Sequence, residues 1–142
     1  KNMKALNNNG SQWLLQQFLA ELMQNQVFYS HISKLACNYA ARLNLLRDGL
    51  SVLFPSGKIA GATAGLHLSL RVDRHPDMIA RLQQRCLLAG IRFDTLPDIE
   101  NGSGAAWRRE NSDAVMFFGF GGLQIQQIKK VLSVLEQALA QP

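Results

Sequence analysis

The 142-residue sequence is poor in cysteine, proline and aromatic residues, with 2 Cys, 4 Pro and 8% Phe, Trp and Tyr. Cys37 and Cys86 stand far apart, so they match neither a disulfide-stapled scaffold nor the spacing of a zinc or redox pair. No apolar run approaches the ~18 residues of a membrane span. No apolar core follows the basic start, as a secretory signal would require. We therefore expect a domain without a membrane segment, in the cytoplasm.

Hydrophobic residues make up 47% of the chain, and they are spread along it. A chain of this length can bury roughly two thirds of its unfolded surface. We predict a single subdomain over 11–142, preceded by a flexible lead-in over 1–10 whose Asn-Asn-Asn-Gly run is typical of a linker. The net charge of +5 permits an acidic partner. The basic residues are scattered, however, as on an ordinary solvated surface.

Four stretches carry apolar residues at steps of three and four, the period of a helix that packs on one side. They are 11–23, Phe28–Leu53, 75–89 and 125–139. The second would extend about 38 Å at 1.5 Å per residue, and we expect such a helix to bridge two domains or to lie along an interface. His75-Pro76-Asp77 favours a helix start, and Gly90 favours a helix end.

Strand patterns separate these helices. Residues 66–72 alternate apolar and polar side chains, which predicts a strand with one buried face. Lys58–Ala60 precedes it, Ile91–Asp94 is a short candidate strand, and Ala114–Phe120 is apolar enough to suggest burial on both faces. The fold class predicted is α+β, with a mostly antiparallel or mixed sheet of about three to four strands packed against helices.

The residues alone show no complete catalytic or metal site. His67 lies on the polar side of its strand, where it is either a packed or hydrogen-bonded residue or a group facing a cleft. His31 and His75 have no ligand partners at metal-site spacing. The glycines at 119 and 121–122 stand before a helix, so they either cradle an anion or simply end a strand.

Arg108 and Arg109 stand in a long loop, 95–113, that is rich in Pro, Asp, Asn, Gly and Ser. Two adjacent arginines can clamp a carboxylate through paired N–H donors. The alternative is that they are solvated loop charges. Trp107 beside them either offers a stacking surface or anchors the loop to the core.

The stretch Gly61-Ala62-Thr63-Ala64-Gly65-Leu66-His67-Leu68 resembles the G-x-x-A-G-L-H-L strand of MocR-type regulators in the GntR superfamily. These proteins join a winged-helix DNA-binding domain to a fold-type-I aminotransferase-like domain. Three further segments resemble the family in the same order, over Ser11 to Ala140. They are the helix with His31-Ile32 and Tyr39-Ala40-Ala41-Arg42, Ala89–Phe93, and Phe117–Phe120 with the last helix. Genuine class I aminotransferases contain the same region.

The resemblance implies the C-terminal small subdomain of a pyridoxal-phosphate-dependent, effector-sensing domain in a bacterial transcription regulator. In that family the cofactor lysine and the DNA-binding domain lie upstream. The contexts of Lys34, Lys58, Lys129 and Lys130 are unlike that of the cofactor lysine. We therefore expect this chain to be no enzyme by itself and to bind no cofactor alone. Its expected partners are the upstream large and winged-helix domains, DNA through the latter, an amino-acid-like effector and further copies in a homo-oligomer.

One departure from the family concerns carboxylate recognition. The family carries an arginine shortly before its closing G-F strand, and Asp113 or Ala114 stands there in this sequence. Arg108 and Arg109 are the nearest arginines, and a loop insertion would have displaced them. Two alternatives stay open: the small subdomain of a working aminotransferase, and a stand-alone α+β interaction module.

Overall fold

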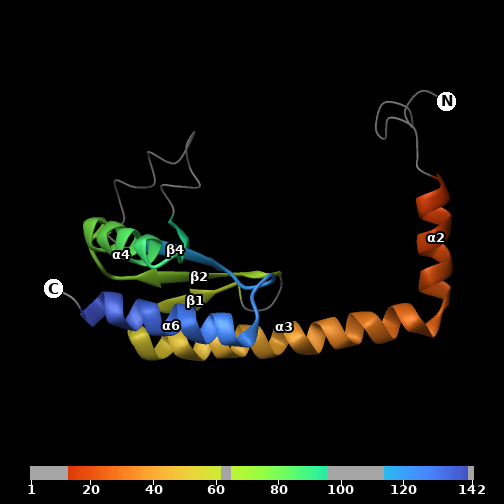
Figure 1. Ribbon diagram of the computed structural model, residues 1–142, viewed down its shortest axis with the longest axis horizontal. Coiled ribbons are helices and arrows are strands. Elements are labelled where there is room, and N and C mark those ends of the chain that lie inside the picture. Colours follow the sequence, from red (N-terminus) through yellow and green to blue (C-terminus); the bar gives the residue numbers. More distant parts are fainter. Residues whose placement is uncertain (1–12, 62–64, 96–113, 141–142) are drawn as a thin grey trace, which may run out of the picture. The chain divides into compact units, whose positions relative to one another are not determined.

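The computed structural model describes residues 13–61, 65–95 and 114–140. Their fold is α+β, which confirms the predicted class (Figure 1). The helices are α2 (Trp13–Gln24), α3 (Gln26–Leu53), α4 (Pro76–Leu88) and α6 (Ile125–Ala140). The strands are β1 (Lys58–Ala60), β2 (His67–Val72), β3 (Asp94–Thr95) and β4 (Ala114–Gly119). All four predicted helices are therefore present.

The chain divides into two compact units, Lys1–Asn38 and Tyr39–Pro142. The boundary falls inside α3. In the first unit, α2 contains no buried residue, although its apolar residues recur at helical spacing. The single subdomain expected over 11–142 stays a prediction. No helix in the described ranges combines the length and the apolar character that crossing a membrane requires.

The second unit is built on a four-stranded sheet in the order β1-β2-β4-β3, with every neighbouring pair antiparallel. In the central pair, Leu68 lies opposite Phe118 and Leu70 lies opposite Met116. Because side chains alternate across a strand, these four share one face. All four are buried, so this face of the sheet forms one side of the core.

Helices supply the other half of that core. The buried helical side chains are Leu46 and Leu50 of α3, Ile79, Leu82 and Cys86 of α4, and Ile128, Leu135 and Ala138 of α6. α6 lies alongside the C-terminal part of α3 (Figure 1). Gly49 makes this approach close, because a Cβ atom there would overlap the Leu132 side chain. The second unit is thus one layer of helices on one face of a sheet.

The expectation that β4 is buried on both faces is wrong. Ala114, Met116 and Phe118 are buried, whereas Val115 and Phe117 are only partly buried. The reason is that the core cluster joins the helices to one face of the sheet. An apolar sequence did not distinguish a strand covered on both sides from one whose second face is partly open.

The predicted strand at Ile91–Asp94 begins too early. Ile91 is part of the end of α4, since its amide donates to the Cys86 carbonyl at 2.9 Å while Gly90 adopts a positive φ of 77°. The Phe93 carbonyl accepts from Gln83 Nε2 at 2.9 Å. Strand pairing therefore starts only at Asp94, opposite Phe117. The predicted cap at Gly90 is confirmed.

Candidate functional site

His67 begins β2 on the partly open face of the sheet. It is exposed, while Leu68 and Leu70 point into the core. Opposite it stands Gly119 of β4. A Cβ atom at Gly119 would lie 3.4 Å from His67 Cδ2 and 3.5 Å from Nε2, so the imidazole packs directly over the glycine backbone. The outward position of His67 is confirmed, and its role in a cleft stays a prediction.

Arg42 of α3 ties the helix to the end of the same strand pair. Its Nη1 donates to the Gly121 carbonyl at 2.8 Å, and its Cζ lies 5.4 Å from the centre of the Tyr39 ring. Both residues are half-buried, and such a cation–π contact contributes about 0.5–2 kcal/mol, more as the site is desolvated. Two separate contact groups, His67 with Gly119 and Arg42 with Gly121 and Tyr39, thus lie near this end of the strands, and we refer to the five residues together as the strand-end cluster.

Arg42 was not among the predicted site residues. A signal for it was present, because Tyr39 and Arg42 are three residues apart and so lie on the same side of a helix. The contact with the Gly121 carbonyl joins residues 79 positions apart, and nothing in the sequence indicates it.

The turn after β4 uses its amides within the protein. The Phe120 amide donates to the Leu66 carbonyl at 3.0 Å, and the Leu123 amide donates to the Phe120 carbonyl at 3.2 Å. The Gln124 amide donates to Gln127 Oε1 at 2.7 Å, which caps the start of α6. Three amides of this glycine-rich turn are thus already satisfied, which favours the strand-ending role of the glycines over an anion cradle.

The strand-end cluster offers binding chemistry. The exposed imidazole of His67 can donate or accept a hydrogen bond with a ligand. The Arg42 guanidinium is engaged with Gly121 and Tyr39, so it joins the turn after β4 to α3. Two positions along β2, the Ser69 hydroxyl donates to the Ala60 carbonyl at 3.4 Å. These groups suit recognition better than nucleophilic attack.

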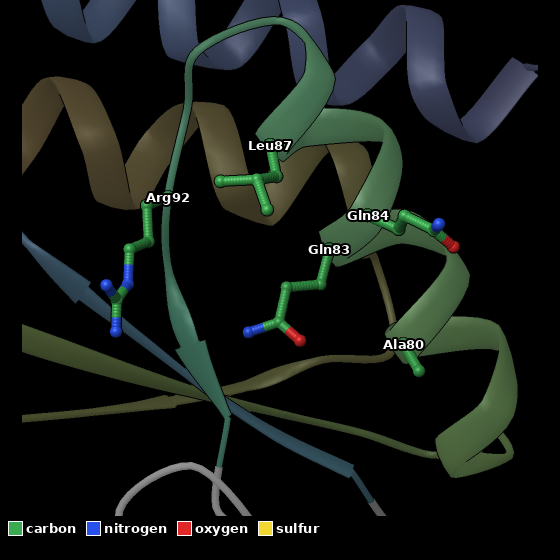
Figure 2. A pocket seen from close by; sticks show the side chains of 5 residues that line it. All are labelled: Ala80, Gln83, Gln84, Leu87 and Arg92. Atoms are coloured by element: carbon green, nitrogen blue, oxygen red, sulfur yellow. The ribbon is translucent and has the colours of Figure 1, made fainter.

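A separate surface hollow of about 330 Å³ lies beside α4. Figure 2 shows its lining side chains, which are Ala80, Gln83, Gln84, Leu87 and Arg92. Gln83 donates to the Phe93 carbonyl, and Arg92 Nε lies 3.4 Å from Asp94 Oδ1. The Gln83 contact holds the segment before β3 against α4, and the Arg92–Asp94 contact lies within that segment and the start of β3, which gives the hollow a structural explanation.

The predicted carboxylate-binding arginines, Arg108 and Arg109, lie outside the described residues, as do Trp107 and Asp113. Ala114 is described: it opens β4 and is 9% exposed. A buried methyl group at this place supplies no hydrogen-bond donor for a carboxylate.

Lysines in the described ranges do not fit a cofactor aldehyde. Lys34 lies on α3, Lys58 on β1, and Lys129 and Lys130 on α6, all four exposed. Desolvation in an apolar pocket is one way in which a protein activates a lysine for Schiff-base formation, and none of these four described lysines is desolvated. The same ranges hold no cluster of three His, Cys, Asp or Glu side chains able to bind a metal ion.

No protein-family model matches the sequence, and no curated protein matches it. Among solved structures, the chain is similar to the aminotransferase Aro8 from Candida albicans, with a TM-score of 0.53 and 12% sequence identity. The match covers 70% of this chain but only 24% of the aminotransferase chain. At this identity the likeness concerns the fold alone. The fold of this chain is therefore aminotransferase-like, and it spans about a quarter of the length of that aminotransferase.

Proposed function

We propose that this chain is the C-terminal small subdomain of a pyridoxal-phosphate-dependent, aminotransferase-like sensing domain in a bacterial transcription regulator. The observation that carries the proposal is the combination of the Gly61–Leu68 motif with a fold that resembles 24% of an aminotransferase chain. The last two residues of the motif are the first two of β2, where His67 points outward and Leu68 is buried. The regulator is cytoplasmic and homo-oligomeric in this proposal.

The chemistry is divided between this subdomain and the rest of the protein. The four exposed lysines support a cofactor lysine located upstream, together with the winged-helix domain that binds DNA. Pyridoxal phosphate bound to that lysine would supply an electrophilic carbon for the amino group of an amino-acid-like effector. His67 contributes hydrogen bonding at the edge of the cleft. Because Ala114 is a buried methyl group, Arg108 and Arg109 are the candidates for the effector carboxylate.

Absorbance spectra test the proposal that the cofactor lysine lies upstream of this chain. Pyridoxal phosphate is added to this chain and, separately, to the protein that includes the upstream sequence. We expect the visible aldimine band only in the longer protein. A stable band with this chain alone would show that one of its own lysines reacts. If the longer protein shows no band either, the cofactor is excluded and the stand-alone interaction module is favoured.

The alternative function is the small subdomain of a working aminotransferase, and the structural likeness to Aro8 favours it. The two functions differ in their products. A regulator changes its affinity for promoter DNA when an amino acid is added, whereas an aminotransferase releases keto acid with repeated turnover. Both quantities are to be measured on the longer protein. Sustained keto-acid release without DNA binding would refute the regulator.

Changing both Arg108 and Arg109 to alanine tests effector recognition in the longer protein. We expect the effector concentration at half-maximal response to rise by about tenfold or more, since a charge-assisted pair contributes about 1.5–3 kcal/mol. The matched control changes Lys129 and Lys130 to alanine, because these are also adjacent exposed cations. An unchanged response in the arginine variant would remove this pair as the carboxylate site.

A further inference from the structure

Helices α4 and α6 border two surface hollows that share a wall. The larger, of about 340 Å³, and the smaller, of about 60 Å³, are both lined by Arg85 of α4 and Ala138 of α6. Arg85 Nη1 donates to the Ala138 carbonyl at 3.0 Å, and this bond joins the two helices where the hollows meet. The hollows are therefore the two halves of one groove, which we call the α4–α6 groove.

The groove has the length of a short helix. Leu82 lines the smaller hollow and Ala89 lines the larger, and these residues are seven positions apart, or about 10 Å along the axis of α4. In a second helix that lies in the groove, side chains seven residues apart have the same separation and point to the same side. Two such side chains can enter one hollow each.

Apolar side chains on both walls of the groove are accessible. Met78 lines the smaller hollow and is 52% exposed, whereas Leu88 lines the larger and is 86% exposed. The two lie within about 80° of each other around α4 at 100° per residue. On the other wall, Val134 and Leu139 of α6 are half-buried. Every lining residue belongs to the second unit, so the shape of the groove does not depend on the first.

The charged residues that line the groove are arginines. They are Arg74 and Arg85, and Arg81 lies on the same side of α4, between Met78 and Leu88 around the helix. Neither Arg74 nor Arg81 forms an ion pair within the part of the chain that the structure describes. The groove therefore combines apolar walls with a positive edge.

Carboxylates of the second unit do not cancel this charge. None lines either hollow. Asp77, in the first turn of α4, pairs with His75, whose Nδ1 lies 3.3 Å from Asp77 Oδ2. Glu136 is two residues before Ala138, which places it about 160° around α6 from the groove. An acidic partner is therefore complementary in charge.

From the two hollows, the exposed apolar wall and the arginines, we propose that the α4–α6 groove binds an amphipathic, acidic helix of a partner protein. Two apolar side chains of that helix, seven residues apart, enter the two hollows, and the bulkier one lies next to Leu88. Carboxylates beside the smaller one face Arg74 and Arg81. This binding requires neither pyridoxal phosphate nor an effector, so it does not rest on the proposed function.

Fluorescence anisotropy with two labelled peptides tests the groove. Both are helical peptides of alanine and glutamine with Val and Phe seven residues apart, and they differ only in carrying two glutamates or two lysines beside Val. We expect the 142-residue chain to bind the glutamate peptide saturably and the lysine peptide at least about tenfold more weakly, because like charges would meet at Arg74 and Arg81. No binding of the glutamate peptide, or equal binding of both, overturns the proposal.

Two adjacent leucines of α4 provide matched variants. Leu88 lines the groove, whereas Leu87 is 59% exposed and lines the separate hollow shown in Figure 2. Leu88→Glu should weaken binding of the glutamate peptide at least about tenfold, since it removes an apolar contact and adds a like charge. Leu87→Glu should leave binding unchanged. Both side chains are exposed, so both variants should keep the wild-type circular dichroism spectrum. Equal effects, or a larger effect of Leu87→Glu, contradict the groove.

Charge reversal distinguishes recognition from a general effect on folding. Changing both Arg74 and Arg81 to glutamate should make the lysine peptide the tighter ligand. The matched control changes Lys58 and Lys129 to glutamate, because these exposed cations line neither hollow, and it should keep the preference for the glutamate peptide. The same reversal in the control would mean that net charge alone decides binding, which overturns the proposal. None of these measurements uses pyridoxal phosphate, so this proposal and the proposed function can fail separately.

Discussion

Helices α2 and α6 have the same apolar spacing but opposite environments. α6 buries Ile128, Leu135 and Ala138 against α3, α4 and the sheet. α2 buries none of its residues. The period of a sequence therefore determines which side of a helix is apolar, whereas burial depends on a neighbour that comes from elsewhere. In the second unit that neighbour is the Leu68–Leu70 face of β2 and its equivalent in β4.

The strongest test of this comparison is a matched pair of leucine truncations. Leu135 of α6 is 0% exposed, whereas Leu15 of α2 is 59% exposed. We expect Leu135→Ala to lower the free energy of unfolding of the second unit by about 2–5 kcal/mol, because it leaves a cavity. Leu15→Ala should change it by no more than about 0.5 kcal/mol. Urea denaturation measures both.

Wild-type-like stability of Leu135→Ala would mean that the α6 side of the core is not formed as described. A large loss in Leu15→Ala would mean instead that α2 is covered by the rest of the chain. Each variant therefore tests one side of the comparison.

The sequence was sufficient for features that depend on local pattern. All four helices, the outward position of His67 and the Gly90 cap follow from spacing and capping chemistry. Features that depend on distant partners were not accessible. The start of β3 is set by the end of α4 and by Gln83, and the partly open face of β4 is set by where the helices lie.

The same distinction applies to the candidate site. His67 was found because the alternation of its strand leaves it on the polar side. Arg42 was missed because its acceptor, the Gly121 carbonyl, lies in a turn far along the chain. The roles of Arg108 and Arg109 stay predictions. The local pattern identified His67, whereas only the packing showed that Arg42 joins α3 to the turn after β4.

The two cysteines extend the comparison to reactivity. Cys37 is exposed in the first unit, and Cys86 is buried in the second. Burial raises the pKa of the Cys86 thiol above its ordinary value of 9.0, so little of the reactive thiolate forms near neutral pH. We expect Cys37 to react with a thiol-specific reagent at least about 100-fold faster, while Cys86 reacts only upon opening of the core. Mass spectrometry of quenched samples measures both rates.

The raised pKa also predicts a pH effect. A group whose pKa is higher in the folded state stabilises the fold below its unfolded pKa, and this contribution is lost as pH rises through the folded value. Stability from Cys86 is therefore lost above about pH 9, and Cys86→Ala should flatten that part of the profile. Comparable reaction rates for the two thiols at pH 7, or the same alkaline slope in Cys86→Ala, would contradict the buried position.

The smallest expected effect compares two cations of the same helix, one on each side of the unit boundary. Arg42 of α3 donates to Gly121 and lies over Tyr39, whereas Lys34 is exposed in the first unit. We expect Arg42→Ala to lower the free energy of unfolding by about 1–2 kcal/mol, since it removes a charged hydrogen bond and the ring contact. Lys34→Ala should change it by less than about 0.5 kcal/mol.

Urea denaturation again measures the change in the free energy of unfolding. The NMR signals of the His67 imidazole show whether the change reaches the end of β2. Because Arg42 holds the turn that follows β4, its loss should also shift the NMR signals of His67, opposite Gly119, while Lys34→Ala leaves them unchanged. Equal effects of the two substitutions would mean that Arg42 is a solvated surface charge. A loss of stability without any change in the His67 signals would mean that Arg42 does not affect the end of β2. The candidate site would then be restricted to β2 and β4.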